Sequence, residues 1–553
     1  MKTSIFHIAL AVAVFGLASP ANAQITKANN TTNLNVGTSW TGSVVPTAST
    51  LAVFDNTLSL TSRTANLGGN VSVLGISATA APVSGTARQW QIGNTANSTL
   101  TIFGSGITKA ANTSAFIIAS AVALGANQTW TLNASSGTGT GNFQLNTTSF
   151  TDAGFTLAIN GGATMGTLDL RAAGTLTLGS NVTIASTVSV NNAAAVVVLG
   201  GANTFNFVTV ASGRLEGATL GNFGVASNFG DGGSNTAITV GGSASTGTMA
   251  YTGNTASSNR TVVRDARSAG NGIEVTTAGQ TLTISGNLSA VSTSTSTTNG
   301  WVFGGAGNLA LSGVISNTVG GGTGTLTKNG TGTLALSGTN TYSGTTTVNA
   351  GTLLVNNLSG SGTGSGDAVV GIAGKLGGTG SFSGSVTVNT GGTLAPGASI
   401  QTLGSGTVSL NTGSTFAYEV DSGVALGVGA DLQKVTGGLN LSGTVALTFA
   451  DLNAIPTAFA LGTTFTLINY SGSWNNGLFT YDATTLADGA IFNMGFNQWE
   501  LDYNATTGGS NFSGEYVGAN FVNIVVIPEP STWAVMAIGL LGLAVLRRRY
   551  RQS

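Results

Sequence analysis

The sequence contains no cysteine, and its single histidine, His7, lies within the first 23 residues. The lack of cysteine excludes disulfide bonds and thiol chemistry. Catalytic serine normally depends on a histidine base, and zinc sites depend on histidine and cysteine ligands. Once the first 23 residues are removed, as the sequence predicts below, none of these sites can form in the rest of the chain.

Carboxylate chemistry is the catalytic option that remains, since polysaccharide lyases and glycosidases work with clustered aspartate or glutamate. The acidic residues of this chain are scattered, and the clearest repeats, residues 305–396, contain only Asp367. The sequence therefore predicts a protein that is not an enzyme and that has no cofactor or metal site. A polysaccharide-active lyase or glycosidase is the alternative.

Charge is also scarce. Only 6% of the residues are charged, against about a quarter in an ordinary globular domain. The formal net charge is −1. The two ends together carry five basic residues and one acidic residue, so the net charge of the chain between them is close to −5. The body has no basic stripe, so nucleic-acid binding is not expected.

Glycine, threonine, serine and asparagine take the place of the missing charges. The chain of 553 residues has 84 glycines, yet 41% of its residues are hydrophobic, so it is not a disordered charged chain. Threonine suits strands, while asparagine and glycine suit tight turns. No stretch away from the two ends shows a helical period, which predicts an all-β fold.

One short phrase recurs in the middle of the chain, in residues 322–356. It reads Gly324-Thr-Leu-Thr, then Gly332-Thr-Leu-Ala-Leu and Gly351-Thr-Leu-Leu-Val, each with alternating polar and apolar residues. Such units are too short to bury their apolar side alone, but stacked copies can do so. Over residues 305–396 the sequence resembles the autotransporter-associated β-strand repeat. That resemblance implies an elongated, right-handed parallel β-helix on the exterior of a bacterial cell.

The N-terminus reads as a secretory signal peptide, residues 1–23. Lys2 is followed by an apolar run too short to span a bilayer comfortably, and Ala21 and Ala23 form a small-x-small cleavage pattern. Residues 24–438 are expected to form the solenoid. Residues 439–526 are richer in aromatics, and we expect them to fold as a compact β cap on the last coil.

The C-terminal segment, residues 527–553, has three parts. Pro528, Glu529 and Pro530 precede an apolar run from Trp533 to Leu546, and a basic cluster ends the chain. That cluster is Arg547, Arg548, Arg549 and Arg551. The apolar run would rise about 21 Å as a helix, a marginal transmembrane span. The basic cluster should stay cytoplasmic, which leaves the body outside.

These three parts, in this order, resemble the PEP-CTERM sorting signal. The resemblance implies cleavage near Pro528–Pro530 by an exosortase, in a bacterium that makes exopolysaccharide. The membrane is then a transient partner, and the protein ends at the cell surface or in the extracellular matrix. A simple tail anchor is the alternative.

Three further groups of residues allow two interpretations. Trp40 is interpreted as part of an N-terminal cap or core rather than as a sugar contact. The charges Arg260, Arg264, Asp265 and Arg267 are interpreted as a solvated loop, with an anionic polysaccharide site as the alternative. The acids Glu419, Asp421 and Asp431 are interpreted as a solvated face, with a Ca²⁺ site as the alternative.

Two glycine-rich pieces superficially suggest phosphate binding. Residues 359–366 are pure glycine, serine and threonine, and we expect them to form a flexible outward loop. Gly374-Lys375-Leu376 lacks the hydroxyl and the following helix that a phosphate-binding loop needs. The sequence thus predicts a non-catalytic structural or adhesive protein, exported and associated with exopolysaccharide.

Overall fold

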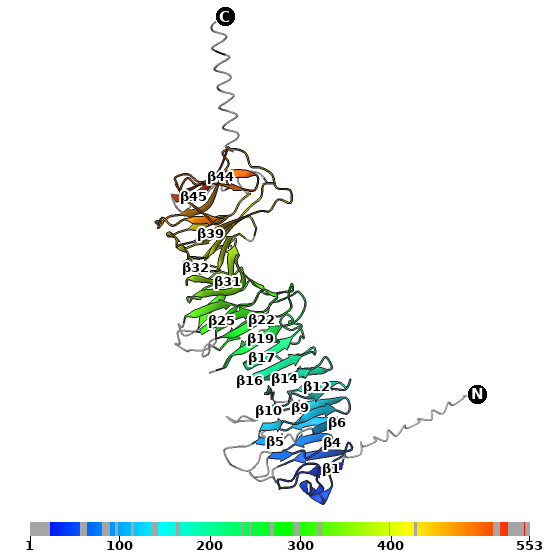
Figure 1. Ribbon diagram of the computed structural model, residues 1–553. Coiled ribbons are helices and arrows are strands. Elements are labelled where there is room, and N and C mark those ends of the chain that lie inside the picture. The colour runs from blue at the N-terminus through cyan, green and yellow to red at the C-terminus, as the bar shows by residue number, and fades with distance from the viewer. Residues whose placement is uncertain are drawn as a thin grey trace, which may run out of the picture.

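The computed structural model describes residues 23–55, 64–79, 89–93, 98–111, 115–133, 142–161, 166–233, 236–242, 245–265, 270–290, 299–318, 323–397, 399–424, 429–511, 520–528 and 547. They form an elongated all-β molecule in which short strands stack along the long axis (Figure 1). The expectation of an all-β fold with stacked parallel strands is confirmed.

Two sheets build the long part of the molecule, and their strands pair in parallel except at β41 (Phe479–Tyr481) and β42 (Thr484–Leu486). The N-terminal sheet follows the order β1 (Ala23–Thr26), β2 (Thr50–Phe54), β4 (Val71–Ala78), β6 (Thr99–Lys109), β9 (Gln128–Leu132), β12 (Leu157–Asn160) and β15 (Val182–Ala185). β8 (Ala121–Leu124) and β11 (Phe150–Thr151) lie beside this path.

The larger sheet carries the stacking onward. Its strands include β5 (Gln89–Gly93), β7 (Ala115–Ile118), β10 (Phe143–Leu145), β13 (Thr167–Leu170), β14 (Thr175–Leu178), β16 (Thr187–Leu199), β17 (Val208–Gly217), β19 (Gly247–Tyr251), β22 (Asn271–Val275), β25 (Asn299–Gly304) and β28 (Gly324–Lys328). A second face of the stack includes β23 (Thr281–Ile284), β26 (Asn308–Leu311), β29 (Thr333–Leu336), β30 (Thr346–Val355), β31 (Ala368–Gly378), β33 (Thr393–Pro396), β36 (Thr415–Val420) and β39 (Val445–Asp451).

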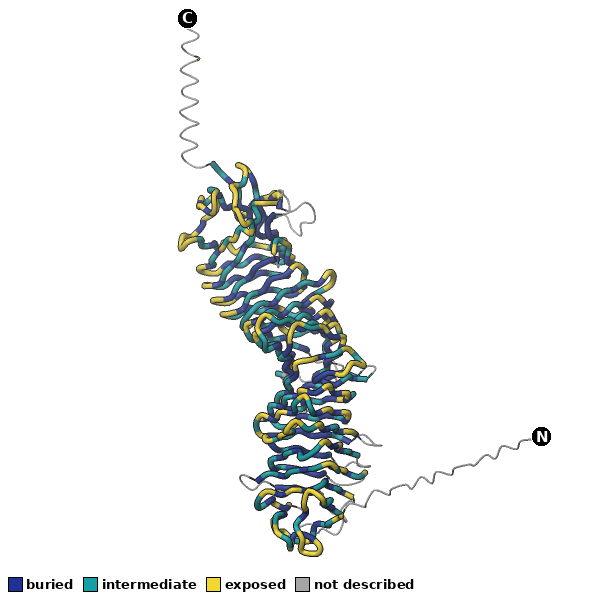
Figure 2. The backbone as a smooth tube through the Cα atoms, turned by 90° about the vertical axis from the view of Figure 1, so that its right-hand side faces the viewer, coloured by how far each residue is buried: buried dark blue, intermediate teal, exposed yellow. Residues whose placement is uncertain are grey.

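The repeated phrase forms an apolar ladder inside this stack. Leu309 pairs with Leu334, which pairs with Leu353, which pairs with Leu376, at separations of 25, 19 and 23 residues. All four side chains are buried. The alternation seen in the sequence therefore places one leucine of each coil directly over the next, which buries a continuous core that no single coil could form. Figure 2 shows this buried interior along the whole tube.

Close contact between coils requires glycine at the start of two of the three phrases, at Gly332 and Gly351. A Cβ at Gly332 would lie 1.8 Å from the carbonyl oxygen of Gly307 in the preceding coil. Residues 359–366 also pack closely against the preceding coil. Thr363 is fully buried, and Gly364, at φ +67°, would place a Cβ 1.8 Å from the carbonyl oxygen of Tyr342. The prediction of a flexible outward loop for residues 359–366 is therefore wrong, because the middle of this turn packs against the coil before it.

The N-terminal end of the stack is closed by Trp40. Its side chain is buried, and its indole Nε1 donates to the carbonyl oxygen of Leu34 at 2.8 Å. The ring meets Phe54 edge-on with centroids 6.1 Å apart. The interpretation of Trp40 as part of the cap and core is confirmed, since the side chain has no face left for a sugar.

The C-terminal end changes to antiparallel pairing. A six-stranded sheet runs in the order β34 (Thr402–Ser405), β37 (Leu432–Val435), β40 (Thr464–Tyr470), β45 (Asn520–Ile527), β44 (Asn497–Ala505) and β43 (Ile491–Met494). Its first three strands are parallel and its last three pairings are antiparallel. Parallel stacking also continues past residue 438, where β39 pairs with β36. The cap therefore grows out of the last coils as a continuation of their sheets.

Aromatic rings fill the cap. Trp474 stacks on Tyr503 with centroids 4.8 Å apart, and Tyr503 lies over Phe479 at 6.1 Å. The Tyr503 hydroxyl donates to the carbonyl oxygen of Leu486 at 3.0 Å and accepts from the amide of Phe479 at 2.7 Å. Buried tyrosine thus supplies both packing area and hydrogen bonds where the regular coils end.

We expect solution scattering to show a rod. A strand spacing of about 4.8 Å over some 16–20 coils of the body predicts a stack of roughly 80–95 Å. The control is circular dichroism of the same sample, which should be dominated by β-structure. A compact, near-spherical particle would contradict this arrangement.

Candidate functional site

The described fold ends where the sorting signal of the sequence begins. β45 is the central strand of the cap sheet and pairs with both β40 and β44. Near its end the amide of Val526 donates to Thr463, and the carbonyl of Val526 accepts from Gly462, both at 2.9 Å. Ile527 is the last paired residue and lies opposite Gln498. The chain is thus held firmly up to Ile527.

Pro528 follows this last pair directly and is half-buried. Proline has no amide hydrogen, so Pro528 cannot donate a backbone hydrogen bond to continue the sheet. Glu529 and Pro530 lie outside the described residues. The processing segment predicted from the sequence therefore begins one residue beyond a rigid, doubly paired strand.

The other predicted terminal features are described only in part. Ala21 lies outside the described residues, whereas Ala23 is the first residue of β1 and pairs with Thr50. Arg547 is exposed. Arg548, Arg549 and Arg551 lie outside the described residues, as does the apolar run from Trp533 to Leu546. In the part of the chain that the structure describes, no helix has the length and apolar character to cross a membrane.

The charge cluster of the body is not a surface feature. Arg260 and Arg264 are fully buried. Arg260 Nη1 donates to the carbonyl oxygen of Gly230 at 3.1 Å, and its guanidinium lies 5.4 Å from the ring centre of Phe223. Burial lowers the pKa of Arg264 to about 10. The solvated-loop interpretation is therefore wrong for these two arginines, and they are not available to a polysaccharide. Arg267 lies outside the described residues, and Asp265 is half-buried.

The three acidic residues Glu419, Asp421 and Asp431 also differ in their exposure to solvent. Glu419 and Asp421 are half-buried, but Asp431 is fully buried. Its Oδ1 accepts from the amide of Gln401 at 3.0 Å, and its Oδ2 accepts from the amide of Glu419 at 3.1 Å. The solvated-face interpretation is wrong for Asp431, which joins two backbone segments. Among the described residues no group of three potential metal ligands is found.

Three lysines are also buried, and each is bonded to the backbone. Lys27, Lys109 and Lys328 point their ammonium groups at backbone carbonyl oxygens. The Lys328 Nζ, for example, donates to Asn329, Gly330 and the following coil's Ala350 at 2.8–3.1 Å. Lys375 instead lies within strand β31, paired with Thr352 and Thr393, so no phosphate-binding loop forms there.

These buried groups predict a minimum of stability near pH 8. Burial lowers the pKa of Lys328 to about 8, so between about pH 8 and 10.5 the unfolded chain binds more protons and stability should rise with pH. Lys27 and Lys109 behave alike. Burial raises the pKa of Asp431 to about 8, so between about pH 4 and 8 the folded chain binds more protons and stability should fall with pH.

Thermal melts from pH 4 to 10 check this prediction. Lys328→Met should reduce the rise above pH 8, and Asp431→Asn should reduce the fall below it. Comparison of each slope with the wild-type slope separates this effect from any general loss of stability. A melting temperature that reaches its maximum at pH 8 would contradict it.

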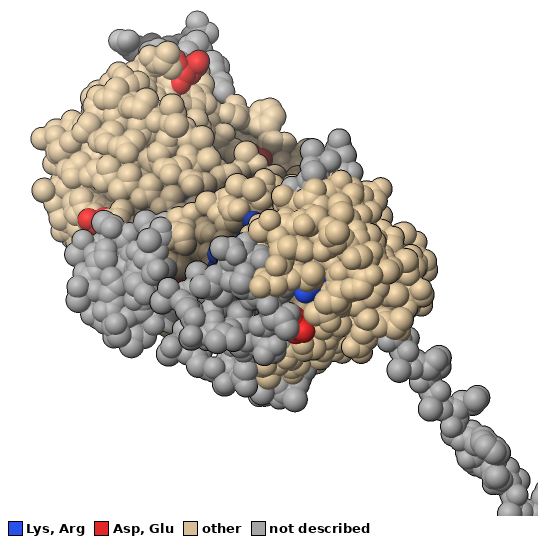
Figure 3. Space-filling view, turned by 90° about the horizontal axis from the view of Figure 1, so that it is seen from below, with Lys and Arg blue, Asp and Glu red and all other residues tan. Residues whose placement is uncertain are grey.

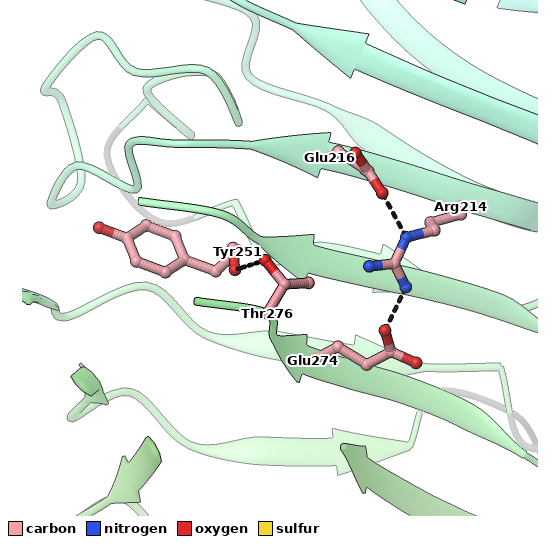
Figure 4. Close-up of polar contacts among 5 residues, drawn as sticks. All are labelled: Arg214, Glu216, Tyr251, Glu274 and Thr276. Atoms are coloured by element: carbon pink, nitrogen blue, oxygen red, sulfur yellow. Dashed lines mark hydrogen bonds and ion pairs between the residues drawn. The ribbon is translucent and has the colours of Figure 1, made fainter. Parts of the chain in front are cut away.

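Besides the ion pair between Arg171 and Asp169, the structure assembles a larger ionic group that was not predicted from the sequence (Figure 4). Arg214 Nε donates to Glu216 Oε1 at 2.5 Å, and Arg214 Nη1 donates to Glu274 Oε2. Glu216 and Glu274 both pair in register with Ala250 of the intervening strand, from opposite sides. The Arg214 guanidinium therefore links β17 to β22 across Ala250 of the strand between them. The Arg-x-Glu spacing was readable in the sequence, but Glu274, sixty residues away, was not.

This cluster is partly exposed, with side-chain exposures of 24%, 22% and 35% for Arg214, Glu216 and Glu274. Burial lowers the pKa of Arg214, but its two carboxylate partners outweigh that effect, so the pKa is raised overall. Both carboxylates are engaged by the same guanidinium. The arrangement is suited to cross-linking coils on the outside of the stack.

Comparison with protein families gives two matches. The model of the passenger-associated-transport-repeat matches residues 326–355, which span most of β28 and all of β29 and β30. The model of the PEP-CTERM protein-sorting motif matches residues 526–549, starting within β45. Comparison of the whole chain with curated proteins gives no match. The chain thus carries a passenger-associated-transport-repeat and a PEP-CTERM protein-sorting motif, which mark an exported protein directed to the cell envelope, and the motif implies processing by an exosortase.

Proposed function

We propose that the protein is a non-catalytic structural or adhesive component of the cell surface or extracellular matrix. After an exosortase cuts near Pro528–Pro530, the rod is released from a transient membrane anchor and associates with exopolysaccharide. The membrane segment and the basic cluster hold the precursor until that cut. The reach of a rod suits a protein that links a surface to a matrix.

The observation that carries the proposal is the outer row of polar, mostly uncharged side chains on the stack. Thr333 pairs with Thr352, which is followed by Lys375, Thr393 and Thr415 in the same register. All five are half-buried, with alternate residues facing the core. Figure 3, which views the molecule from the end that carries β1, shows few charged side chains among the described residues there. Hydroxyl groups both donate and accept, as the hydroxyls of a polysaccharide do.

Such a surface spreads binding over many equivalent coils. We therefore expect no single aspartate or glutamate to be essential for function. The purified protein should co-sediment with the exopolysaccharide of its host and leave the length of the polysaccharide chains unchanged. Sedimentation in parallel with an unrelated charged polysaccharide serves as the control.

The alternative of an enzyme can be tested at one pair of carboxylates. Glu216 and Glu274 are two carboxylates that one arginine brings together on the outside of the stack. Shortening of the polysaccharide by the wild-type protein, lost in Glu216→Gln or Glu274→Gln while the protein stays folded, would favour a lyase or glycosidase. Absence of both binding and shortening would count against an association with polysaccharide.

A further inference from the structure

Exposed apolar side chains gather where the chain leaves the cap. The described residues include twelve exposed large hydrophobic side chains, and five of these lie between residues 452 and 496. Ile455, Leu461 and Phe496 are 78%, 62% and 66% exposed. We call these three residues the exit rim. Single exposed apolar residues are ordinary, but a group in one place indicates a contact surface.

Backbone pairing places Leu461 and Phe496 beside the end of β45, and Pro456, next to Ile455, lines a pocket together with Phe496. Leu461 immediately precedes Gly462, whose amide donates to Val526 at 2.9 Å. Phe496 lies two residues before Gln498, the partner of Ile527. Because β44 and β45 are antiparallel, residues after Ile527 leave past Phe496. Figure 1 places β44 and β45 at the end of the molecule opposite β1.

The rim is held rigidly. Asn497 clamps its two loops together, donating to the carbonyl of Phe459 at 3.0 Å and accepting from the amide of Phe459 at 2.9 Å. Beneath the loops, the Phe459 ring contacts both Phe465 and Trp499, with centroids 5.1 and 5.8 Å apart. The exposed side chains thus stand on a packed aromatic base, so no ordering of the loops is needed before they bind.

The two segments that carry the rim side chains contain no charged residue. Residues 452–481 contain no aspartate, glutamate, lysine or arginine, and neither do residues 489–499. The carboxylate beside them, Asp451, lines a pocket with Phe496, but it is half-buried and accepts from the amides of Ser422 and Asn453. The chain beyond Ile527 has only five residues before Trp533, where the apolar run begins. At about 3.3–3.6 Å per residue these can span no more than about 20 Å. Insertion of the apolar run therefore keeps the rim close to the bilayer.

We propose that the exit rim docks the cap on the outer surface of the lipid bilayer before processing. Ile455, Leu461 and Phe496 enter the interface, and the docked cap presents Pro528 at a fixed height above the hydrocarbon. This proposal rests on the proposed anchoring of the precursor. Docking of the rim adds to the anchoring because it fixes the position of the processing segment. A flexible tether alone would leave that segment free to move.

The absence of cysteine makes a direct test possible. Full-length protein with Leu461→Cys or Phe496→Cys is labelled with an environment-sensitive fluorophore and reconstituted into vesicles of phosphatidylethanolamine and phosphatidylglycerol. Matched controls are Leu358→Cys and Ile372→Cys, which are at least as exposed but lie in the solenoid. We expect nitroxide-labelled lipids to quench the rim labels at least severalfold more than the control labels.

Flotation of the same vesicles separates the two levels of the proposal. Protein that does not float with the vesicles contradicts the anchoring itself. Protein that floats but shows equal quenching at rim and control sites leaves the anchor intact and overturns the docking. In cells, the triple variant Ile455→Asn, Leu461→Asn, Phe496→Asn should be processed severalfold more slowly than the variant Leu358→Asn, Ile372→Asn. Slow processing together with unquenched rim labels would overturn lipid docking and assign the rim to a protein partner.

Discussion

Replacement of Pro528, Glu529 and Pro530 by alanine is expected to leave an intact, membrane-bound precursor. Pro528 follows the last residue of β45 and has no amide hydrogen to donate, so it cannot continue the hydrogen bonds of the sheet. Alanines restore the donors at positions 528 and 530 and remove the fixed φ of the prolines, so the segment is no longer held as an extended, unpaired substrate. Loss of Glu529 also removes a charge that resists movement into the hydrocarbon.

Mass spectrometry of the mature protein provides the measurement. The wild-type C-terminus should lie at residues 527–531, and the fold favours a cut at or after Pro528, because Val526 and Ile527 are held in the sheet. The control replaces the neighbouring Ser531 and Thr532 by alanine and should mature normally. Recovery of an intact Arg-rich tail from protein outside the cell would show that the segment is not processed. Normal maturation of the triple-alanine variant would show that a simple tail anchor is the better description.

Gly332→Ala should destabilise the solenoid by at least about 2 kcal/mol, the scale of overpacking in a well-packed interior. The added Cβ would lie 1.8 Å from the carbonyl oxygen of Gly307, an atom of the neighbouring backbone. Backbone cannot move aside as a flexible side chain can, so the two coils must separate locally. Because each coil is stabilised by its neighbours, we expect local opening and earlier proteolysis in this region.

Gly104→Ala is the matched control for this prediction. Gly104 lies within β6, and the nearest atom to its added Cβ is the carbonyl oxygen of Asn127 at 4.0 Å. Alanine there should be neutral or stabilise by up to about 1 kcal/mol, because it reduces the freedom of the unfolded chain. Thermal midpoints and limited proteolysis of both variants check the pair. Equal effects of the two substitutions would contradict the close-contact explanation.

The features that depend on local pattern could be predicted from the amino-acid sequence. Alternation in phrases such as Gly332-Thr-Leu-Ala-Leu decided which side chains face inward, and the structure buries Leu334 and Leu336 as that pattern requires. The two family matches likewise rest on contiguous residues, 326–355 and 526–549. Such features are readable because a strand repeats every two residues and a sorting signal is a linear motif.

The environment of the charged residues depends on the tertiary fold and could not be predicted from the sequence. Arg260 and Asp431 have charged side chains, which are usually exposed to solvent. In this protein neighbouring coils enclose both residues and supply their hydrogen-bond partners. Glu274 reaches Arg214 only because the lengths of the intervening coils bring β22 into register two strands beyond β17. The exit rim likewise depends on β45 lying between β40 and β44. Burial and partnership of this kind depend on contacts between residues far apart in the chain, and such contacts leave no periodic trace in the sequence.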